Sequence, residues 1–159
     1  MKVIKFFIRE DPYGFLSNFE RTPIVIDGLT YPTVEHYYQS MKVDQKFPAL
    51  RKWIREAPKA SYVKAIGDSL NTHFIMKPYK DPDWEPEKKK IEMKKAITVK
   101  FSVYPNRQLL LDTGTAILHE DNTDDPFWGM GDGSGESWLG KLLMQVRDEI
   151  RKDEGDKDG

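Results

Sequence analysis

The sequence contains no cysteine, which excludes disulfide bonds and metal sites built from thiolates. That composition fits a reducing compartment, so we expect a cytoplasmic protein. The three histidines, His36, His73 and His119, are far apart in the sequence, and no metal site is predicted. No apolar run approaches membrane-spanning length, and the N-terminus is too short and too charged for a signal peptide, so no membrane partner is expected.

Motifs for nucleotide binding and for a serine nucleophile are missing as well. There is no G-x-x-x-x-G-K-[ST] loop, no dinucleotide fingerprint after a strand and no G-x-S-x-G. The glycines over 129–135 suggest a phosphate cradle, but they lack the lysine and the preceding strand. These absences argue against an ATPase or an NAD-dependent dehydrogenase, and we expect no cofactor.

The net charge of −1 gives no case for general nucleic-acid binding. The charges are unevenly spread, however, because residues 42–100 are rich in lysine and arginine whereas 112–136 are acidic. A local basic surface could therefore bind the phosphate of a small molecule.

The length of 159 residues and the mixture of patterns predict a compact single α+β domain, mostly helical with a few short strands. We expect this domain over 1–152 and a charged, frayed tail over 153–159. Gly67 and Gly114 are interpreted as helix stops, Thr33 as the N-cap of the helix at 34–43, and Asp27-Gly28 as a turn after the second strand. Strands are predicted at 3–8, 23–26 and 115–118, and helices at 34–43, 48–56, 61–66, after 86, at 106–113 and from 137 onward.

The stretch Asp121–Gly140 is unusual because it holds five of the eleven glycines and two of the four tryptophans. Glycines allow a close backbone approach to a ligand, and tryptophan offers a flat stacking face. We interpret the stretch as a binding loop for a ring attached to a sugar or phosphate; the alternative is a surface turn whose tryptophans fill the core. Trp128 fits the binding interpretation better, whereas Trp138 opens a helical stripe and is predicted to be core.

The segment Tyr31–Gln39 places Glu35 in the first turn of a helix among aromatic residues. A carboxylate there can simply complement the helix dipole, or it can be desolvated and serve acid–base chemistry. Lys64 has two similar interpretations, a charge near a helix end or a pocket lysine. Trp84 is either an anchor for the helix that follows or a stacking face.

The ordered set of segments resembles the YbiA-like family, also called the NADAR family, over about residues 6–150. The segments that carry the resemblance are Gly14–Phe19, Asp27-Gly28, Tyr31–Gln39 with Lys42, Lys64–Gly67, Trp84, Met93 with Ala96, Lys100 and Phe101, Leu109–Leu111 with Thr113, Leu118 with Glu120, Asp125–Gly135, and Leu139–Met144 with Arg147.

The resemblance implies a small, mainly helical α+β fold and an N-glycosidase. Its substrate would be a small molecule that joins a heterocyclic base to (phospho)ribose or ADP-ribose, such as an early riboflavin-pathway intermediate, or ADP-ribosylated guanine in a nucleic acid. The alternative function is a module that binds a nucleotide or ADP-ribose without cleaving it.

The resemblance also implies the residues of the site. Val63 and Ser137 depart from the family pattern, which has alanine and asparagine there, and Ser137 cannot reproduce the paired donor and acceptor of an amide. Trp84 and Trp128 would sandwich the base, and backbone donors of 14–19 and 129–135 would bind phosphate. The implied catalytic residues are Glu35, Lys64 and Asp132, and the implied substrate-binding residues are Ser17, Asn18, Phe19, Trp84, Asp125, Trp128, Gly129 and Gly131.

Overall fold

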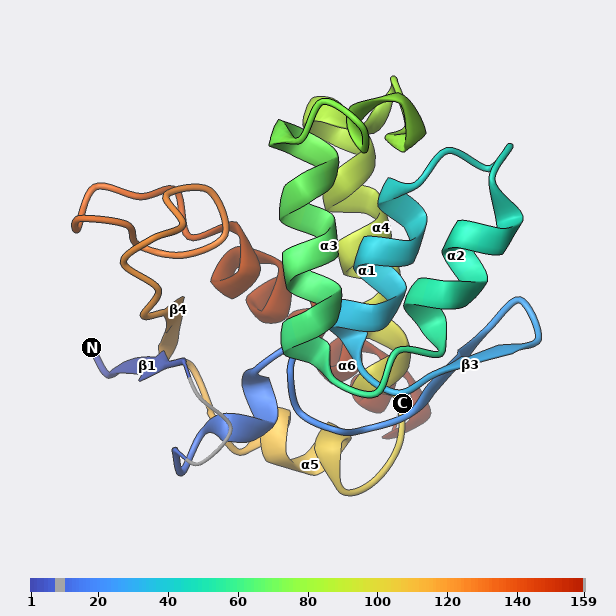
Figure 1. Ribbon diagram of the computed structural model, residues 1–159. Coiled ribbons are helices and arrows are strands. Elements are labelled where there is room, and N and C mark those ends of the chain that lie inside the picture. The colour runs from blue at the N-terminus through green and yellow to red at the C-terminus, as the bar shows by residue number, and fades with distance from the viewer. Residues whose placement is uncertain (8–10, 159) are drawn as a thin grey trace. The chain divides into compact units, whose positions relative to one another are not determined.

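The predicted α+β class is confirmed, because helices hold about half of the residues and short strands form two small sheets. The computed structural model describes residues 1–7 and 11–158. The elements in chain order are β1 (Val3–Phe6), η1 (Gly14–Leu16), β2 (Ile24–Ile26), β3 (Leu29–Tyr31), α1 (Val34–Lys42), α2 (Pro48–Arg55), α3 (Ala60–Thr72), η2 (Lys77–Tyr79), η3 (Trp84–Lys88), α4 (Lys89–Lys100), α5 (Asn106–Leu111), β4 (Ile117–Glu120) and α6 (Trp138–Asp158) (Figure 1).

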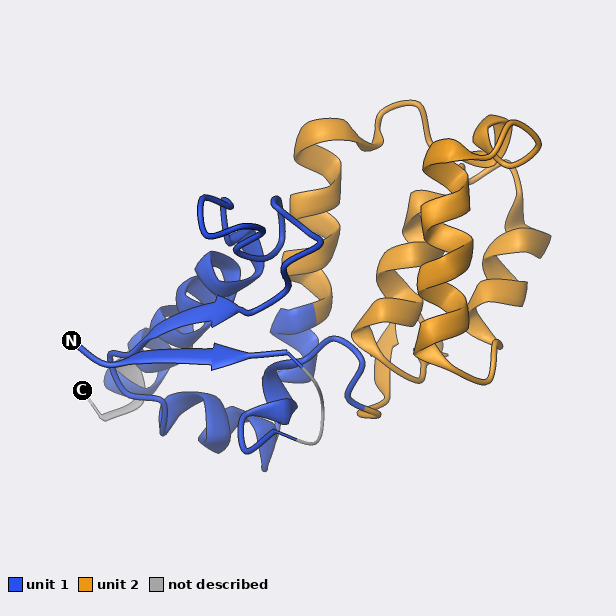
Figure 2. Ribbon diagram, turned by 60° about the vertical axis from the view of Figure 1, so that its left-hand side comes forward, with its two compact units in different colours: residues 1–20, 97–159 blue, residues 21–96 orange. Residues whose placement is uncertain are grey.

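The chain forms two compact units, which are described separately (Figure 2). Unit 1 comprises residues 1–20 and 97–159, and unit 2 comprises residues 21–96. The predicted domain over 1–152 and the predicted frayed tail over 153–159 stay predictions, although helix α6 continues to Asp158.

Unit 2 begins with a hairpin that leads into helix α1. Strands β2 and β3 pair in antiparallel register, and Asp27 and Gly28 between them have φ values of 52° and 79°. Positive φ at both positions is what a two-residue hairpin turn requires. Thr33 then starts α1, because its side-chain oxygen accepts a hydrogen bond from the backbone nitrogen of His36 at 3.1 Å. The sequence predicted both the turn and this N-cap.

Helix α3 corrects one prediction. Gly67 was expected to end a short helix, but α3 continues through it to Thr72. A Cβ atom at position 67 would lie 1.9 Å from Oε1 of Gln39 on α1. The glycine is therefore explained by the close approach of a side chain from α1, not by a turn at the helix end.

Helices α1, α2 and α3 pack side by side, with α1 between the other two in Figure 1. Their shared core is apolar, and partly buried Phe47, Leu50, Ala57, Ile66, Met76 and Tyr79 pack around it. Burial of such side chains supplies the main stabilising free energy of a helical layer. The buried members of this core are Val43, Ile54, Val63 and Leu70.

In unit 1, strands β1 and β4 pair in parallel, with Val3 opposite Ile117 and Phe6 opposite Glu120. The predicted extension of the first strand to Ile8 lies outside the described residues. Helix α6 packs directly on β4, since a Cβ atom at Gly140 would lie 1.8 Å from the carbonyl oxygen of Leu118. Gly140 is thus the point at which helix and strand backbones touch.

Candidate active site

Three polar residues of α1 occupy one face of the helix, toward α3. Glu35, Gln39 and Lys42 follow at spacings of four and three residues, which place side chains on the same side of a helix. Glu35 is only 6% exposed, and its Oε1 accepts a hydrogen bond from Nε2 of Gln39 at 2.8 Å. Lys42 is only 4% exposed, and its Nζ donates to the carbonyl oxygen of Gly67 at 2.8 Å. This face is a buried polar cluster inside an otherwise apolar helical layer.

Burial dominates the electrostatics of Glu35. It raises the pKa of the Glu35 carboxyl, because the charged form loses its hydration. The hydrogen bond from Gln39 and the positive charges of Lys64 and Lys42 oppose this rise without cancelling it. A carboxyl with a raised pKa can take up a proton nearer neutral pH than an exposed glutamate can.

Lys42 is a member of this cluster whose role sequence reasoning missed. Burial, followed by the positive charge of Lys80, lowers the pKa of the Lys42 ammonium to about 8. The sequence contained the signal that finds it, namely the spacing of Glu35, Gln39 and Lys42 along one helix. The resemblance included Lys42 but gave it no role.

Lys64 lies on α3, the helix that packs against this face of α1. Its side chain is 44% exposed, and its Nζ forms an ion pair with Asp68 at 3.1 Å. It still acts electrostatically on Glu35. The structure therefore brings two of the three predicted catalytic residues, Glu35 and Lys64, to the same pair of helices.

His36 is a structural residue at the start of α1. It is fully buried, its Nε2 donates to the carbonyl oxygen of Ala57 at 2.9 Å, and its Nδ1 lies 2.7 Å from the hydroxyl of Thr33. Burial lowers its pKa, which favours the neutral ring. These contacts fix the start of α1, and with it the position of Glu35.

Trp84 lies in the interior of unit 2. It is 1% exposed, and its ring centroid lies 5.2 Å from that of Tyr38 at a tilted angle. Its Nε1 is buried with no hydrogen-bond partner among the described residues. This burial fits the interpretation of Trp84 as an anchor for the helix that follows, and its role as a stacking face stays a prediction.

In the glycine loop of unit 1, polar groups form hydrogen bonds with other groups of the same loop. Asp125 Oδ1 accepts from the backbone nitrogens of Phe127 and Trp128 at 3.0 and 2.9 Å. The backbone nitrogen of Gly129 donates to the carbonyl of Asp125, and that of Gly131 to Asn122. Both amides are thus engaged inside the loop, and the binding of phosphate at these glycines stays a prediction.

Asp132 is exposed at the tip of this loop. Its Oδ1 accepts from the hydroxyl and the backbone nitrogen of Ser134 at 2.6 and 3.1 Å. Those two hydrogen bonds, first the one from the hydroxyl, lower the pKa of the Asp132 carboxyl. An acid held in its ionised form is a poor proton donor, so the geometry disfavours the predicted catalytic role.

The two tryptophans of the loop differ in burial, and the prediction that Trp138 belongs to the core is wrong. Trp128 is buried, with its ring in an edge-on contact with Phe127 at 4.8 Å between centroids. Trp138, predicted to be core, is half-buried and lies under the ammonium of Lys141, 4.7 Å from the ring centroid. Helix periodicity alone did not identify which ring fills the interior.

The predicted binding residues Ser17, Asn18 and Phe19 follow η1 in unit 1. Ser17 and Asn18 are buried, and Phe19 is half-buried. The hydroxyl of Ser17 accepts from the backbone nitrogen of Phe19 at 3.1 Å, and its carbonyl accepts from Nζ of Lys100 at 2.8 Å. Burial lowers the pKa of the Lys100 ammonium to about 7. Buried Lys100 thus fixes the backbone of this turn through its hydrogen bond to the carbonyl oxygen of Ser17.

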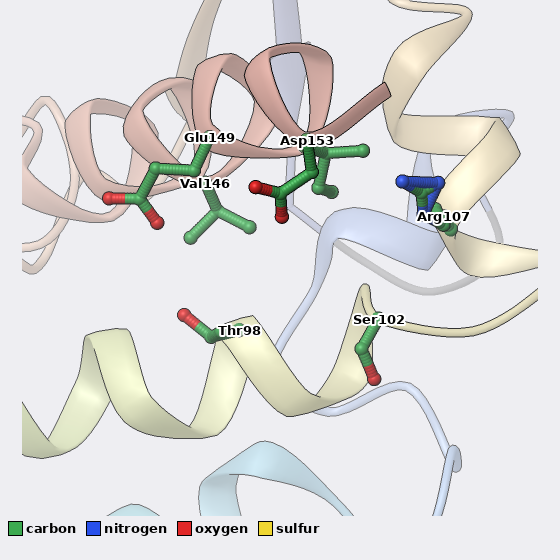
Figure 3. A pocket seen from close by; sticks show the side chains of 7 residues that line it. Thr98, Ser102, Arg107, Val146, Glu149 and Asp153 are labelled. Carbon is green, nitrogen blue, oxygen red and sulfur yellow. The ribbon is translucent and has the colours of Figure 1, made fainter. Parts of the chain in front are cut away.

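A pocket of about 500 Å³ in unit 1 contains none of the predicted site residues (Figure 3). Glu149 and Asp153 of α6 lie across it from Thr98 and Ser102. Within residues 1–7 and 11–158, no group of three His, Asp or Glu side chains is arranged to hold a metal ion. Over the same part of the chain, no helix is long and apolar enough to cross a membrane.

Comparison with known proteins identifies the family. The model of the NADAR domain matches residues 6–151. The chain belongs to the NADAR domain family. The predicted family is therefore confirmed, and the match covers both units.

Two relatives and one solved structure show the extent of the similarity. N-glycosidase YbiA of Shigella boydii is 37% identical over 151 residues, which are 93% of this chain and 88% of that protein. The chloroplastic riboflavin biosynthesis protein PYRR of Zea mays is 38% identical over 93% of this chain but only 25% of its own length. The solution structure of Escherichia coli YbiA superposes with a TM-score of 0.81 at 35% identity, covering 96% of this chain and 87% of that one. At the level of these homologues, the predicted class of enzyme, an N-glycosidase, is confirmed.

Proposed function

We propose that this NADAR protein hydrolyses the N-glycosidic bond between a heterocyclic base and a (phospho)ribose or ADP-ribose, with Glu35 as the principal carboxylate. The observation that carries the proposal is the buried Glu35 on α1, with a raised carboxyl pKa and with Gln39 and Lys64 beside it. The name of the YbiA relatives supports the reaction, and the name of the maize relative supports a substrate from riboflavin biosynthesis.

The reaction breaks the bond between C1′ of the sugar and a ring nitrogen of the base. The sugar passes through an oxocarbenium-like state, water adds its hydroxyl to C1′, and the base leaves with a proton. The ionised carboxylate of Glu35 stabilises the positive charge at C1′ or takes the proton of the attacking water. Burial suits both roles, because a charge interacts more strongly where water is excluded.

Lys64 has two candidate roles, which are the binding of phosphate and the formation of an imine with C1′ of a ring-opened ribosylamine. The ion pair with Asp68 uses the ammonium form of Lys64, and an ammonium cannot attack a carbonyl carbon. The contact with Asp68 thus supports the phosphate role. Borohydride treatment during turnover, followed by mass spectrometry, separates the two roles, because only the imine leaves a substrate fragment on Lys64.

The remaining site residues are proposed as contacts for substrate. Asp132 is exposed and ionised, which fits an acceptor for a sugar hydroxyl better than an acid. We retain a binding role for the predicted aromatic, polar and glycine positions, which are Ser17, Asn18, Phe19, Trp84, Asp125, Trp128, Gly129 and Gly131.

Incubation of the wild-type protein with two compounds tests this function. One is 5-amino-6-ribosylaminouracil 5′-phosphate, and the other is an oligonucleotide with ADP-ribosylated guanine. Chromatography should show a free base from the first, or free ADP-ribose from the second, with Glu35→Gln as the inactive control. If the wild-type protein binds both compounds and releases neither product, the protein is a binding module and the proposed activity is wrong.

A further inference from the structure

The nitrogen and the oxygen of the Gln39 side-chain amide have different surroundings. Its Nε2 donates to Oε1 of Glu35 at 2.8 Å, one helical turn earlier on α1. Its Oε1 is also buried, and no donor in the described part of the chain reaches it. A buried carbonyl oxygen without a donor is costly, so natural proteins rarely retain one without a use for it. One end of this amide therefore holds Glu35, while the other end can still accept a hydrogen bond.

Gly67 explains how this amide fits between two helices. A Cβ atom at position 67 would lie 1.9 Å from Oε1 and 2.7 Å from Nε2 of Gln39, so any side chain there would displace the amide. The carbonyl oxygen of Gly67 also accepts from Nζ of Lys42 at 2.8 Å. Glycine inside a helix destabilises the helix relative to alanine. The close contact with Gln39 explains why a glycine occupies position 67 despite this loss of helix stability.

We propose that Gln39 is a positioning residue for Glu35 and holds its carboxyl group in both protonation states. While Glu35 is ionised, Nε2–H of Gln39 donates to it, as observed. Once Glu35 has taken a proton from water, the amide turns over about its Cγ–Cδ bond, and Oε1 accepts the new O–H of Glu35. The two ends of a glutamine amide have nearly the same size, so the amide occupies nearly the same space before and after the turn. This inference rests on the proposed function of Glu35.

The charges around Glu35 are compatible with this role. Lys64 and Asp68 on α3 and Lys42 on α1 act on its carboxyl, with both lysines lowering its pKa and Asp68 raising it. Gln39 donates a buried hydrogen bond to Glu35, whereas Lys42 donates to Gly67 and Lys64 forms an ion pair with Asp68. Gln39 is therefore the neighbour best placed to set the direction of the Glu35 carboxyl.

Charged and titratable groups on the other neighbours of α1 are engaged elsewhere. Arg51 on α2 donates to a backbone carbonyl after the end of α1 at 2.9 Å. Arg55 on α2 lies over the ring of Tyr31 on β3, 5.9 Å from its centroid. Tyr37 donates its hydroxyl to Glu92 on α4. A shift in the titration of Glu35 on changing Gln39 therefore reports on Gln39 itself.

The substitution Gln39→Met tests the proposal, because methionine has a similar length and neither amide atom. Carbon-13 NMR of the glutamate carboxyls, with the Glu35 signal assigned by Glu35→Gln, follows the titration without substrate. Gln39→Met removes the bond to either form of Glu35, and the pKa of Glu35 should rise, because the charge-assisted bond to the ionised carboxylate is the stronger of the two. The acidic limb of the pH–rate profile should move upward with it, and kcat should fall by about tenfold to a hundredfold with little change in KM.

Ser40→Ala is the matched control, since Ser40 is also a buried polar residue of α1 but bonds to the carbonyl of Arg51 at 3.3 Å. It should leave the titration of Glu35 and kcat unchanged. Gly67→Ala should also disrupt the hydrogen bond between Gln39 and Glu35, because the new methyl group displaces the Gln39 amide without removing it. In the double variant Gln39→Ala/Gly67→Ala the new methyl group has room, so the melting temperature should exceed that of Gly67→Ala alone.

The outcomes separate this inference from the proposed function. An unmoved Glu35 titration in folded Gln39→Met, with Glu35→Gln inactive, overturns the positioning role alone. A shifted titration with full activity in Glu35→Gln overturns the catalytic role of Glu35, and the positioning role with it. A shifted titration together with a reduced kcat in both Gln39→Met and Gly67→Ala supports the proposal.

Discussion

The face of α1 that carries Glu35 and the glycine loop around Asp132 both present carboxylates, but their surroundings differ. Glu35 is buried in a helix, and burial raises the pKa of its carboxyl. Asp132 is exposed in a turn, and hydrogen bonds from Ser134 lower the pKa of its carboxyl. The same functional group is prepared for proton transfer in one place and for turn stabilisation in the other. Surroundings rather than residue type separate the catalytic candidate from its rival.

The largest expected effect compares these two carboxylates directly. Glu35→Gln should lower kcat by about 10²–10⁴-fold while substrate still binds, because the amide can neither take a proton nor stabilise a cation. Asp132→Asn should stay within a few-fold of wild type, because the amide oxygen can still accept from Ser134. Steady-state kinetics on both variants measures the difference, with Glu56→Gln on the exposed end of α2 as the control. Equal losses for Glu35→Gln and Asp132→Asn would remove the distinction between the two regions.

The second comparison concerns stability. Trp84→Ala should reduce the free energy of unfolding by about 3–5 kcal/mol, as expected for truncation of a buried ring. Trp138→Ala should cost clearly less, because Trp138 is only half-buried. Denaturant unfolding of both variants checks this order. The reverse order would contradict the difference in burial between Trp84 and Trp138.

These tryptophans show how far the sequence could lead. Thr33 as a helix cap and Asp27-Gly28 as a hairpin turn were predictable, because each depends on residues close in the chain. The burial of Trp84 depends on Tyr38, which lies far away in the sequence, and no local pattern reveals it. Contacts between distant residues were the part that could not be foreseen.

The same limit applies to the site. Glu35 and Lys64 were identified through the family resemblance, and the structure places both on the α1–α3 pair. The continuation of α3 past Gly67 was missed, because a glycine that makes room for a distant side chain looks like one that ends a helix. The engaged amides of Gly129 and Gly131 were missed for a related reason, since the partners of a loop's backbone groups are set by its folded path.

The third prediction uses two helical glycines. Gly140→Ala in α6 would bring a methyl group against the backbone of Leu118, whereas the nearest atoms to a methyl group in Gly67→Ala in α3 belong to the movable side chain of Gln39. We expect Gly140→Ala to cost about 1–3 kcal/mol or more in stability, as overpacking does. Gly67→Ala should lose less stability and more activity. Thermal melts together with kcat measurements decide it, and equal stability losses would contradict the difference between the two contacts.

The smallest expected effect is a gain of stability. Because the folded-state pKa of Glu35 is raised, the stability that Glu35 contributes is complete below its unfolded pKa and is lost as the pH rises through the folded value. Glu35→Gln should therefore melt at a higher temperature than wild type at pH 8, and the difference should shrink near pH 4. Melting curves across this range measure it. A variant that is less stable than wild type at pH 8 would show that the buried charge is better compensated than the structure indicates.

The pH dependence of kcat/KM for the wild-type protein tests the central claim most directly. A glutamate exposed to water titrates near about pH 4.3. If the ionised Glu35 performs the reaction, activity should be lost as the pH falls, with an acidic limb clearly above that value, because burial raises the pKa of this carboxyl. An acidic limb at the ordinary carboxyl value, or none above it, would contradict a buried Glu35 as the catalytic group.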